Sequence, residues 1–191
     1  MDELIDIVDK NGKPTGHSVP KSEIHKKGYF HHTAHLWIYN TNGEILLQQR
    51  AASKAIHPLL WDVSVAGHID AGETPEQGAI REAKEEIGIT LKDNDLLKIG
   101  VFECFQTYPH GIIDNEFHHT FIAKTECVLK DFTLQKEEVE ALKFISLAEF
   151  KSLLASSATN GHFVGTNKAY YLKVVDSILK ATKQDNDDLE N

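Results

Sequence analysis

The chain has 191 residues, of which 41% are hydrophobic and 26% charged, proportions that are ordinary for a globular protein. Its length suits one domain with a full hydrophobic core and is short for two. The 20 Lys and Arg residues against 29 Asp and Glu residues give a formal net charge of −9. This balance argues against general nucleic-acid binding, which needs a basic surface, but it allows a small anionic substrate held through a bound cation.

The remaining composition indicates a cytoplasmic protein. Its two cysteines, Cys104 and Cys127, cannot form a disulfide framework and fit a reducing compartment. The N-terminal stretch lacks the basic and apolar regions of a secretory signal, and no apolar run approaches the roughly 20 residues of a membrane span. We therefore expect neither a membrane partner nor a nucleic-acid partner.

The hydrophobic pattern along the chain predicts a mixture of strands and helices. Strands are predicted at residues 4–8, 31–39, 44–49, 61–65, 97–107, 116–127 and 142–146. Helices are predicted at residues 20–27, 74–88, 147–154 and 168–182. We expect a single domain of the α/β (α+β) class over residues 1–183, followed by a disordered acidic tail at 184–191.

One predicted helix carries clear signals at both ends. Thr74 is a good N-cap, Pro75 suits the first helical position, and Gln77 completes a capping box. Gly88 is placed to end the helix. These signals define the ends of the helix independently of any function, so the residues within it can be assigned to its faces from their spacing.

Three carboxylates, those of Glu82, Glu85 and Glu86, fall within an arc of about 100° on this helix. Like charges at such spacings repel by about a few tenths of a kcal/mol per pair, whereas a hard cation such as Mg²⁺ or Mn²⁺ would bind among them. The alternative is a solvated acidic face with partners such as Lys84, which is the usual meaning of an acidic helix face taken alone.

The segment that leads into the helix favours the metal site. The stretch 67–89, GHIDAGETPEQGAIREAKEEIGI, resembles the Nudix box, and a smaller Ala83 in place of a larger aliphatic residue is its one departure. The matching positions are Gly67, Glu73, Arg81, Glu82, Glu85, Glu86, Gly88 and Ile89. The resemblance implies a Nudix-type α/β/α sandwich around a mixed β-sheet and a metal-dependent hydrolase that cleaves a diphosphate linkage.

The resemblance also implies a role for each of these residues. The ligands of Mg²⁺ or Mn²⁺ would be Glu82, Glu85, Glu86 and the backbone carbonyl of Gly67. Arg81 would pair with Glu73 and so fix the loop against the helix. One of the helix glutamates, or a carboxylate from elsewhere such as Glu116, would act as the base for the attacking water.

A second resemblance extends over much of residues 1–150, to type 1 isopentenyl-diphosphate isomerase, which shares the Nudix fold. It is carried by the stretches EIHKKGYFHHTAHLWIYNTNGEILLQQRA, AGHIDAGE and DNEFHHTFIA. The positions that match the isomerase's buried metal site are His25, His31, His68, Asp114 and Glu116. Such a site would suit Mn²⁺, Zn²⁺ or Mg²⁺. The alternative is a partial match by chance in a chain with 11 histidines.

The chain departs from the isomerase where that enzyme needs its catalytic cysteine. The position beside Gly67 holds Ala66, which has no proton to give, and neither Cys104 nor Cys127 stands in that motif. The chain also keeps the complete glutamate helix that the isomerase tends to lack. Hydrolysis is therefore the favoured reaction, with a nucleoside diphosphate derivative or a related organic diphosphate as the substrate.

Two further activities stay open beside hydrolysis, an isomerase-like reaction and a non-catalytic sensor that binds a diphosphate metabolite. Arg50 and Lys54, just before the box, are candidate substrate-binding residues for phosphate, with surface solubility as the alternative. A homodimer is common in the family that the chain resembles, so the resemblance allows a homodimer here.

Other residues are weaker candidates for contact with the substrate. Trp37 and Trp61 could stack on a planar group, although a place in the core or at its rim is the more common role. The loop 108–111 could touch substrate or be explained by turn chemistry alone. The acidic run 137–140 is more commonly a solvated charge cluster than a part of a site.

Overall fold

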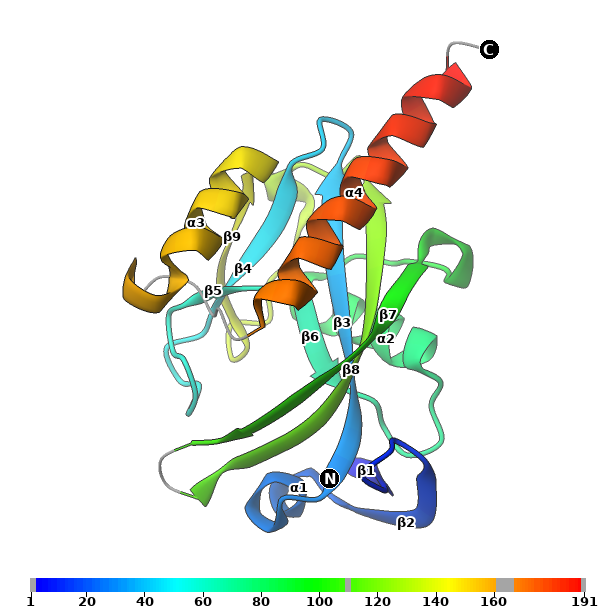
Figure 1. Cartoon of the computed structure of the whole chain (residues 1–191), viewed down its shortest axis with the longest axis vertical. Helices are drawn as coiled ribbons and strands as arrows, with labels where there is room; N and C mark the ends of the chain where they lie inside the picture. The colour runs from blue at the N-terminus through cyan, green and yellow to red at the C-terminus, as the bar shows by residue number, and fades with distance from the viewer. Residues whose placement is uncertain (1–2, 109–110, 161–166, 190–191) are drawn as a thin grey trace.

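The structure is a computed structural model that describes residues 3–108, 111–160 and 167–189 (Figure 1). The strands are β1 Leu4–Val8, β2 Pro14–Pro20, β3 Phe30–Asn40, β4 Ile45–Arg50, β5 Trp61–Asp62, β6 Val65–His68, β7 Leu97–Thr107, β8 Ile113–Thr125 and β9 Val139–Ile145. The helices are α1 Lys21–Lys27, α2 Pro75–Ile87, α3 Leu147–Asn160 and α4 Lys168–Leu189, with short 3₁₀ turns η1 Asp93–Asp95 and η3 Leu129–Asp131. Among the described helices, none has the length and apolar character needed to cross a membrane.

The strands form one mixed sheet with β3 at its centre. β3 pairs antiparallel with β1, β4 and β6, and it pairs in parallel with β8 along its whole length, from Phe30 opposite Asn115 to Asn40 opposite Thr125. β7 extends the sheet beyond β8, and β9 pairs with β4. The parallel pairing of β3 with β8 is what makes the sheet mixed, and a mixed sheet is what the family resemblance implied.

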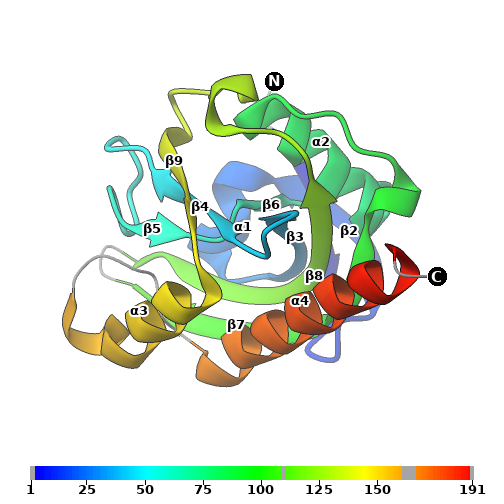
Figure 2. The same cartoon turned by 90° about the horizontal axis from the view of Figure 1, so that it is seen from above.

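Helices cover both faces of this sheet (Figure 2). α2 packs on one face, where Leu36 and Ile38 of β3 meet Ala83 and Ile87 in one buried cluster. α3 and α4 cover the other face, where Trp37 packs in a second buried cluster. Because neighbouring side chains of a strand point to opposite faces, β3 contributes to both cores. The α/β/α sandwich predicted from the resemblance is confirmed.

The signals predicted for α2 are all present. The Thr74 side chain accepts from the Gln77 backbone N–H, the Gln77 side chain accepts in return from the Thr74 N–H, and Pro75 begins the helix. Gly88 ends it with φ 77°, and a Cβ there would lie 2.8 Å from Cβ of Thr133. Only glycine satisfies both the left-handed backbone and this close packing.

Some predicted elements differ from the structure. The strand expected at 61–65 is two strands, because the Ser64 hydroxyl takes part in the hydrogen bonding: it accepts from Ile38 N–H and donates to Leu46 C=O. The strand β2 was not predicted, because its residues are mostly exposed and show no hydrophobic alternation. It forms through pairing with β1.

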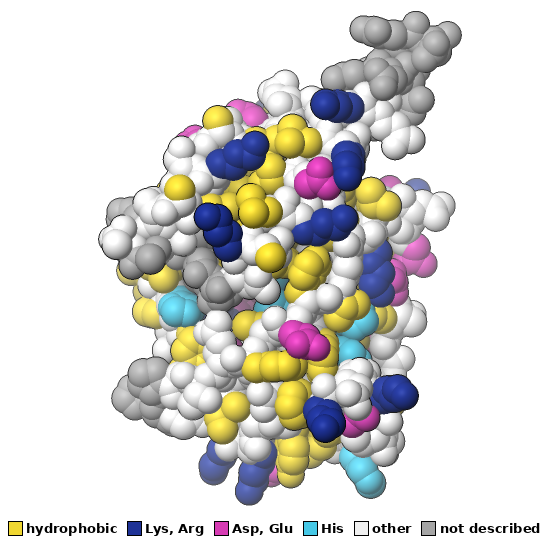
Figure 3. All heavy atoms as spheres, in the orientation of Figure 1, with side chains coloured by type: hydrophobic (Ala, Val, Ile, Leu, Met, Phe, Trp, Pro, Cys, Tyr) yellow, Lys and Arg dark blue, Asp and Glu magenta, His cyan; other side chains and the backbone are white. Residues whose placement is uncertain are grey.

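Both C-terminal helices are longer than predicted. α3 continues to Asn160, and α4 continues to Leu189, through most of the segment expected to be a disordered tail. No proline or glycine interrupts residues 184–189, so the backbone hydrogen bonds of the helix can continue there without an apolar face to hold them. The face that carries α4 and β7 shows hydrophobic side chains among Lys and Arg (Figure 3), so the net acidity is not spread evenly over the surface.

Candidate active site

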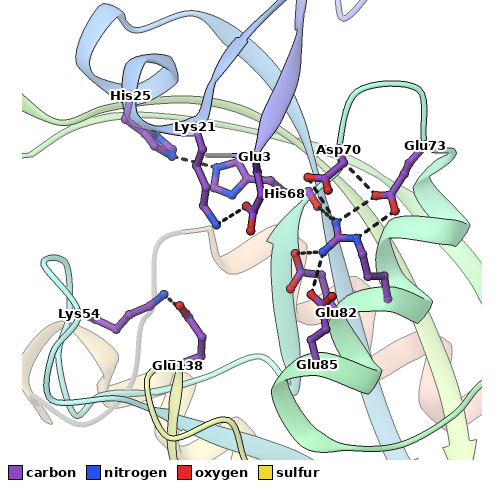
Figure 4. Close-up of polar contacts among 11 residues, drawn as sticks. Glu3, Lys21, His25, Lys54, His68, Asp70, Glu73, Glu82, Glu85 and Glu138 are labelled. Atoms are coloured by element: carbon purple, nitrogen blue, oxygen red, sulfur yellow. Dashed lines mark hydrogen bonds and ion pairs between the residues drawn. The ribbon is translucent and has the colours of Figure 1, made fainter. Parts of the chain in front are cut away.

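Arg81 of α2 joins the helix to the loop and the strand before it. Its Nε and Nη2 donate to the two carboxylate oxygens of Glu73 at 2.9 and 3.0 Å, and Nη2 also donates to the His68 carbonyl at 2.9 Å. Its Nη1 donates to Glu82 at 2.9 Å and to Glu85 at 3.2 Å. Figure 4 shows these carboxylates converging on one guanidinium. Partial burial alone would raise the pKa of Glu73, but the hydrogen bonds from Arg81 outweigh burial and lower it.

Gly67 lies directly against the carboxylate of Glu82. A Cβ at position 67 would overlap that carboxylate, so the close approach of strand β6 to helix α2 requires glycine here. The Glu82 side chain is largely buried, and burial raises its pKa although Arg81 opposes the shift. The strand backbone at Gly67 and the helix carboxylate are therefore neighbours, as the resemblance implied.

Glu86 is the most deeply buried of the three helix carboxylates. Its Oε2 has no hydrogen-bond partner in the described structure, and burial, reinforced by the nearby charge of Glu82, raises the pKa of Glu86 well above its usual range. Glu85 is by contrast half exposed, with 52% of its side chain accessible. A buried carboxylate beside another is costly unless a cation compensates, so this group fits a divalent metal ion.

Three histidines and a glutamate from four different elements meet in a second cluster. They are His25 of α1, His31 of β3, His68 of β6 and Glu116 of β8, each with one potential ligand atom within 4.8 Å of those of the others. The parallel register of β3 and β8 puts His31 opposite Glu116, and the antiparallel register of β3 and β6 puts His68 opposite Thr33, two residues further along the same face.

The ring nitrogens in this cluster have the environment that a metal ion requires. His31 Nε2 is buried with no hydrogen-bond partner among the described residues and lies 3.5 Å from Glu116 Oε1. His25 Nε2 and His68 Nε2 face each other at 2.9 Å. Burial lowers the pKa of His68 well below its usual value, which keeps the ring in the neutral form that binds metal. The donor set fits Mn²⁺ or Zn²⁺.

Asp114 lies behind this cluster, outside the four residues whose ligand atoms converge. Its Oδ1 is 2.9 Å from His25 Nδ1, while the other nitrogen of that ring faces His68. A carboxylate in this position fixes the orientation of a metal-binding histidine. The sequence predicted Asp114 as a direct ligand, and the geometry instead suits it to holding His25.

His118, which the sequence interpretation did not single out, contacts the cluster through Glu116. Its Nε2 lies 2.9 Å from Glu116 Oε2. Burial alone would lower the pKa of His118, but hydrogen bonds with Cys104 and Glu116 raise it to about 9. The spacing of two residues on a predicted strand was the signal available in the sequence, since it puts both side chains on one face.

The two candidate phosphate-binding residues are engaged with the protein itself. Arg50 donates through Nη1 to Asp62 at 3.2 Å and through Nε to the Ile56 carbonyl at 3.1 Å. Lys54 is ion-paired with Glu138, across from α2 in Figure 4. Glu138 belongs to the acidic run that was interpreted as a solvated cluster, and the structure places it in the wall of the site instead.

Most of these groups line one cavity of about 420 Å³. The three helix carboxylates, Arg50 and Lys54 share it with His25, His68 and Glu116 of the histidine cluster, and Ala66, Cys104 and Tyr108 line it too. His31 is fully buried and does not line the cavity. Trp37 is fully buried in the core, as expected for the more common role, and Trp61 packs at the edge of that core under Lys143. Of the loop 108–111, Pro109 and His110 lie outside the described residues.

Comparison with known proteins assigns the family. The NUDIX domain pattern matches residues 29–164. The chain belongs to the Nudix family. Nudix hydrolases act on pyrophosphate bonds and generally need divalent metal ions, and the complete box on α2 is the part of this chain that corresponds to that chemistry.

Its Nudix relatives carry two kinds of name. The chain is 40% identical over 159 residues to Nudix hydrolase 3 of Arabidopsis thaliana, a match that covers 81% of this chain but only 20% of that longer protein. It is 38% identical to an uncharacterized Nudix hydrolase of Clostridium acetobutylicum, over 80% of this chain and 74% of the relative. It is also 34% identical to an isopentenyl-diphosphate Delta-isomerase of Photorhabdus laumondii, over 81% of this chain and 83% of the relative.

Solved structures confirm the Nudix fold. A protein from Deinococcus radiodurans has a TM-score of 0.66 at 18% identity, with 90% of this chain and 97% of that chain covered. The Nudix domain of Shewanella oneidensis NrtR, determined with ADP ribose, has a TM-score of 0.50 at 18% identity, with 63% of this chain and 75% of that chain covered. At these identities the likeness concerns the fold alone. The chain thus belongs to a Nudix subgroup that includes both hydrolases and isomerase-like relatives.

Proposed function

We propose that the protein is a Mg²⁺- or Mn²⁺-dependent hydrolase that cleaves the diphosphate linkage of a nucleoside diphosphate derivative or a related small organic diphosphate. The observation that carries the proposal is the buried carboxylate of Glu86, whose Oε2 has no hydrogen-bond partner among the described residues, beside Glu82 at one wall of the cavity. Such a pair is stabilised by a hard cation, and a diphosphate would reach that cation through the cavity.

The helix residues would hold the ion together with strand β6. Glu82, Glu85 and Glu86 supply carboxylate oxygens, and the Gly67 carbonyl supplies a neutral one. The bound ion would neutralise diphosphate oxygens and lower the pKa of a water. Arg81 keeps Glu82 and Glu85 in position through its two hydrogen bonds. The catalytic base is a carboxylate of this cavity, either one of the helix glutamates or Glu116.

The histidine cluster is proposed as a second metal site. Two observations support this: His31 Nε2 is buried without a hydrogen-bond partner among the described residues, and the Nε2 atoms of His25 and His68 point at each other at 2.9 Å. Glu116 would complete the ligand set and Asp114 would orient His25. The ion there would have four side-chain ligands of mixed nitrogen and oxygen type, which suits Mn²⁺ or Zn²⁺.

Lys54 and Arg50 would bind the phosphates. Lys54 lies in the wall of the cavity and is paired with a single carboxylate, Glu138, which a phosphate oxygen could replace. Arg50 uses Nε and Nη1 for contacts within the protein, and in the described structure Nη2 has no hydrogen bond that would compete with a ligand. Both residues would be drawn to the substrate by charge.

The test is turnover by the full chain with Mg²⁺ or Mn²⁺ against nucleoside diphosphate derivatives, sugar diphosphates and prenyl diphosphates, followed by phosphorus NMR. We expect metal-dependent cleavage of at least one ligand, reduced by at least about 100-fold in Glu85→Gln and Glu86→Gln. Glu76→Gln is the matched control, since Glu76 is on the same helix and does not line the cavity; among the described residues its ion pair is with Lys98, at 3.9 Å. Wild-type rates in the Glu85 or Glu86 variants would remove those residues from the mechanism.

The isomerase reaction is the second candidate, because the histidine cluster and several relatives point toward it. It requires an acid on the face of the alkene opposite the base, and Ala66 cannot supply one. Cys104 lies in the cavity, but it is opposite Glu116 in the β7–β8 register and so on the same side as that carboxylate. We expect no exchange of solvent deuterium into isopentenyl diphosphate, and its detection would favour the isomerase.

A further inference from the structure

A second group of cavity residues lies on the loop between β4 and β5, residues 51–60, and at the end of β7. His57 of that loop and Tyr108 both line the cavity, with their rings edge to face at a centroid distance of 5.6 Å and an interplanar angle of 83°. Neither residue belongs to the Nudix box or to the histidine cluster. What they contribute to the site therefore has to be read from their own contacts.

The loop is held in a strained conformation by its neighbours. His57 has φ 51° and Leu59 has φ 61°, both in the left-handed region that side chains other than glycine rarely adopt. Arg50 fastens the loop through its side-chain bond to the Ile56 carbonyl, and the Leu59 N–H donates to the Arg50 carbonyl at 3.1 Å. Strain of this kind persists where surrounding contacts impose it, and it is common beside functional sites.

The strained conformation presents a polar atom that no described residue satisfies. His57 Nε2 is buried and has no hydrogen-bond partner among the described residues, although its ring lines the cavity. Burial, together with the charge of Arg50, lowers the pKa of His57, so the ring is neutral near pH 7. A buried ring nitrogen without a partner is rare in folded proteins and indicates a hydrogen bond made by a ligand.

The polar groups of the cavity wall at His57 and Tyr108 favour a diphosphate that carries a heteroaromatic ring over one that carries a prenyl chain. A prenyl chain against His57 would leave Nε2 buried and unpaired, and beside it lies the ion pair of Arg50 and Asp62. A site with polar groups rejects an analogue that cannot bond to them. A flat heteroaromatic ring can bond to Nε2 at its edge and pack on the Tyr108 ring with its face.

We propose that His57 and Tyr108 bind the organic group of the substrate, and that this group is a heteroaromatic ring with hydrogen-bonding edges, such as a nucleobase, rather than a prenyl chain. The inference rests on the proposed function in so far as the diphosphate occupies the metal end of the same cavity. It adds the residues that select what the diphosphate carries.

The test is equilibrium binding to the full chain with Mn²⁺, measured by calorimetry. Three ligands separate the contributions: methylenediphosphonate, which has no organic group, α,β-methylene-ADP, which has a nucleobase, and isopentenyl diphosphate. We compare the wild type with His57→Gly and with Leu59→Gly as a matched control. Both substitutions relieve a positive φ in the same loop, but Leu59 is 47% exposed and does not line the cavity.

We expect the wild type to bind α,β-methylene-ADP at least about 10-fold more tightly than methylenediphosphonate or isopentenyl diphosphate. His57→Gly should lose that preference and keep its affinity for methylenediphosphonate, and Leu59→Gly should keep both. An unchanged preference in His57→Gly, or tighter binding of isopentenyl diphosphate by the wild type, would overturn this inference while leaving the hydrolase proposal in place. If none of the three binds in a metal-dependent way, both fail.

Discussion

His118 Nε2 lies 2.9 Å from Glu116 Oε2, while the other oxygen of that carboxylate, Oε1, faces His31 Nε2 at 3.5 Å. The two oxygens thus have separate partners, and His118 determines which one is presented to the histidine cluster. Burial opposes ionisation of Glu116, yet the hydrogen bond from His118 and the nearby ring of His31 hold the pKa of Glu116 well below its usual range. Glu116 is therefore charged and oriented before any ion binds.

Removing this contact should weaken metal binding without removing a ligand. His118→Phe keeps a ring that can stack on His35, whose ring centroid is 3.9 Å away, but loses the bond to Glu116. We expect the affinity of the cluster for Mn²⁺ to fall about 10- to 100-fold in His118→Phe. In His118→Gln, which retains a hydrogen-bond donor, the affinity should fall less. Calorimetric titration of the full chain measures both. The control is His119→Gln, on the opposite face of β8. Equal Mn²⁺ affinity in His118→Phe and the wild type would contradict the role of His118 in orienting Glu116.

Gly67→Ala should disable the helix site while leaving the fold largely intact. The added Cβ meets the end of a flexible side chain, Glu82, so the carboxylate can swing away at little cost to stability but loses its place beside the strand. We expect the rate to fall at least about 100-fold with a melting temperature close to wild type. Turnover and thermal unfolding of the variant and the wild type are measured in parallel. A wild-type rate in Gly67→Ala would show that β6 does not approach the Glu82 carboxylate as closely as the structure indicates.

Glu86→Gln should have opposite effects on stability with and without metal. Burial raises the pKa of Glu86, so at neutral pH its ionised form destabilises the metal-free fold. In a chelator the variant should melt at a higher temperature than the wild type. In saturating Mg²⁺ or Mn²⁺ the melting temperature of the wild type should rise more than that of the variant. The difference between the two melting temperatures should therefore narrow or change sign. Thermal unfolding in both buffers tests this, and a variant less stable than wild type in chelator would contradict it.

Acid should destabilise the protein partly through His119. Burial, with the charges of His32 and Lys98, lowers the pKa of His119 to about 4, below its unfolded value near 6.5. The neutral ring is therefore favoured by folding, and this contribution is fully present above pH 6.5 and is lost as the pH falls toward 4. In His119→Gln the melting temperature should fall less steeply between pH 6.5 and 4 than in the wild type. Parallel slopes would show that other groups carry the acid sensitivity.

The parts of the site that could be predicted are those with local signals. The limits of α2 follow from Thr74, Pro75 and Gly88, and the spacing of three glutamates then fixes their common face. The histidine cluster was available only through family resemblance, because its members meet through the registers of β3 with β6 and β8. Register depends on pairing between distant segments, which hydrophobic alternation does not specify.

The remaining site residues depend on packing that no local pattern encodes. His57 is placed by a strained loop, and its significance lies in an absent partner that only coordinates reveal. Glu138 belonged to an ordinary-looking acidic run, and its place beside Lys54 follows from the path of β9. The role expected of Asp114, as a direct ligand, stays a prediction, because a sequence match does not distinguish a direct ligand from a residue that orients one, and Asp114 lies 2.9 Å from His25 Nδ1.

The origin of His25 has a consequence for how the histidine cluster is held together. His31, His68 and Glu116 come from β3, β6 and β8, which are paired within one sheet, whereas His25 comes from the seven-residue helix α1. Three corners of the cluster are therefore fixed by strand pairing and the fourth by the packing of a short helix. A shift of α1 alone would open the cluster while the three strands stayed paired, which makes this helix the element on which the completeness of the site depends.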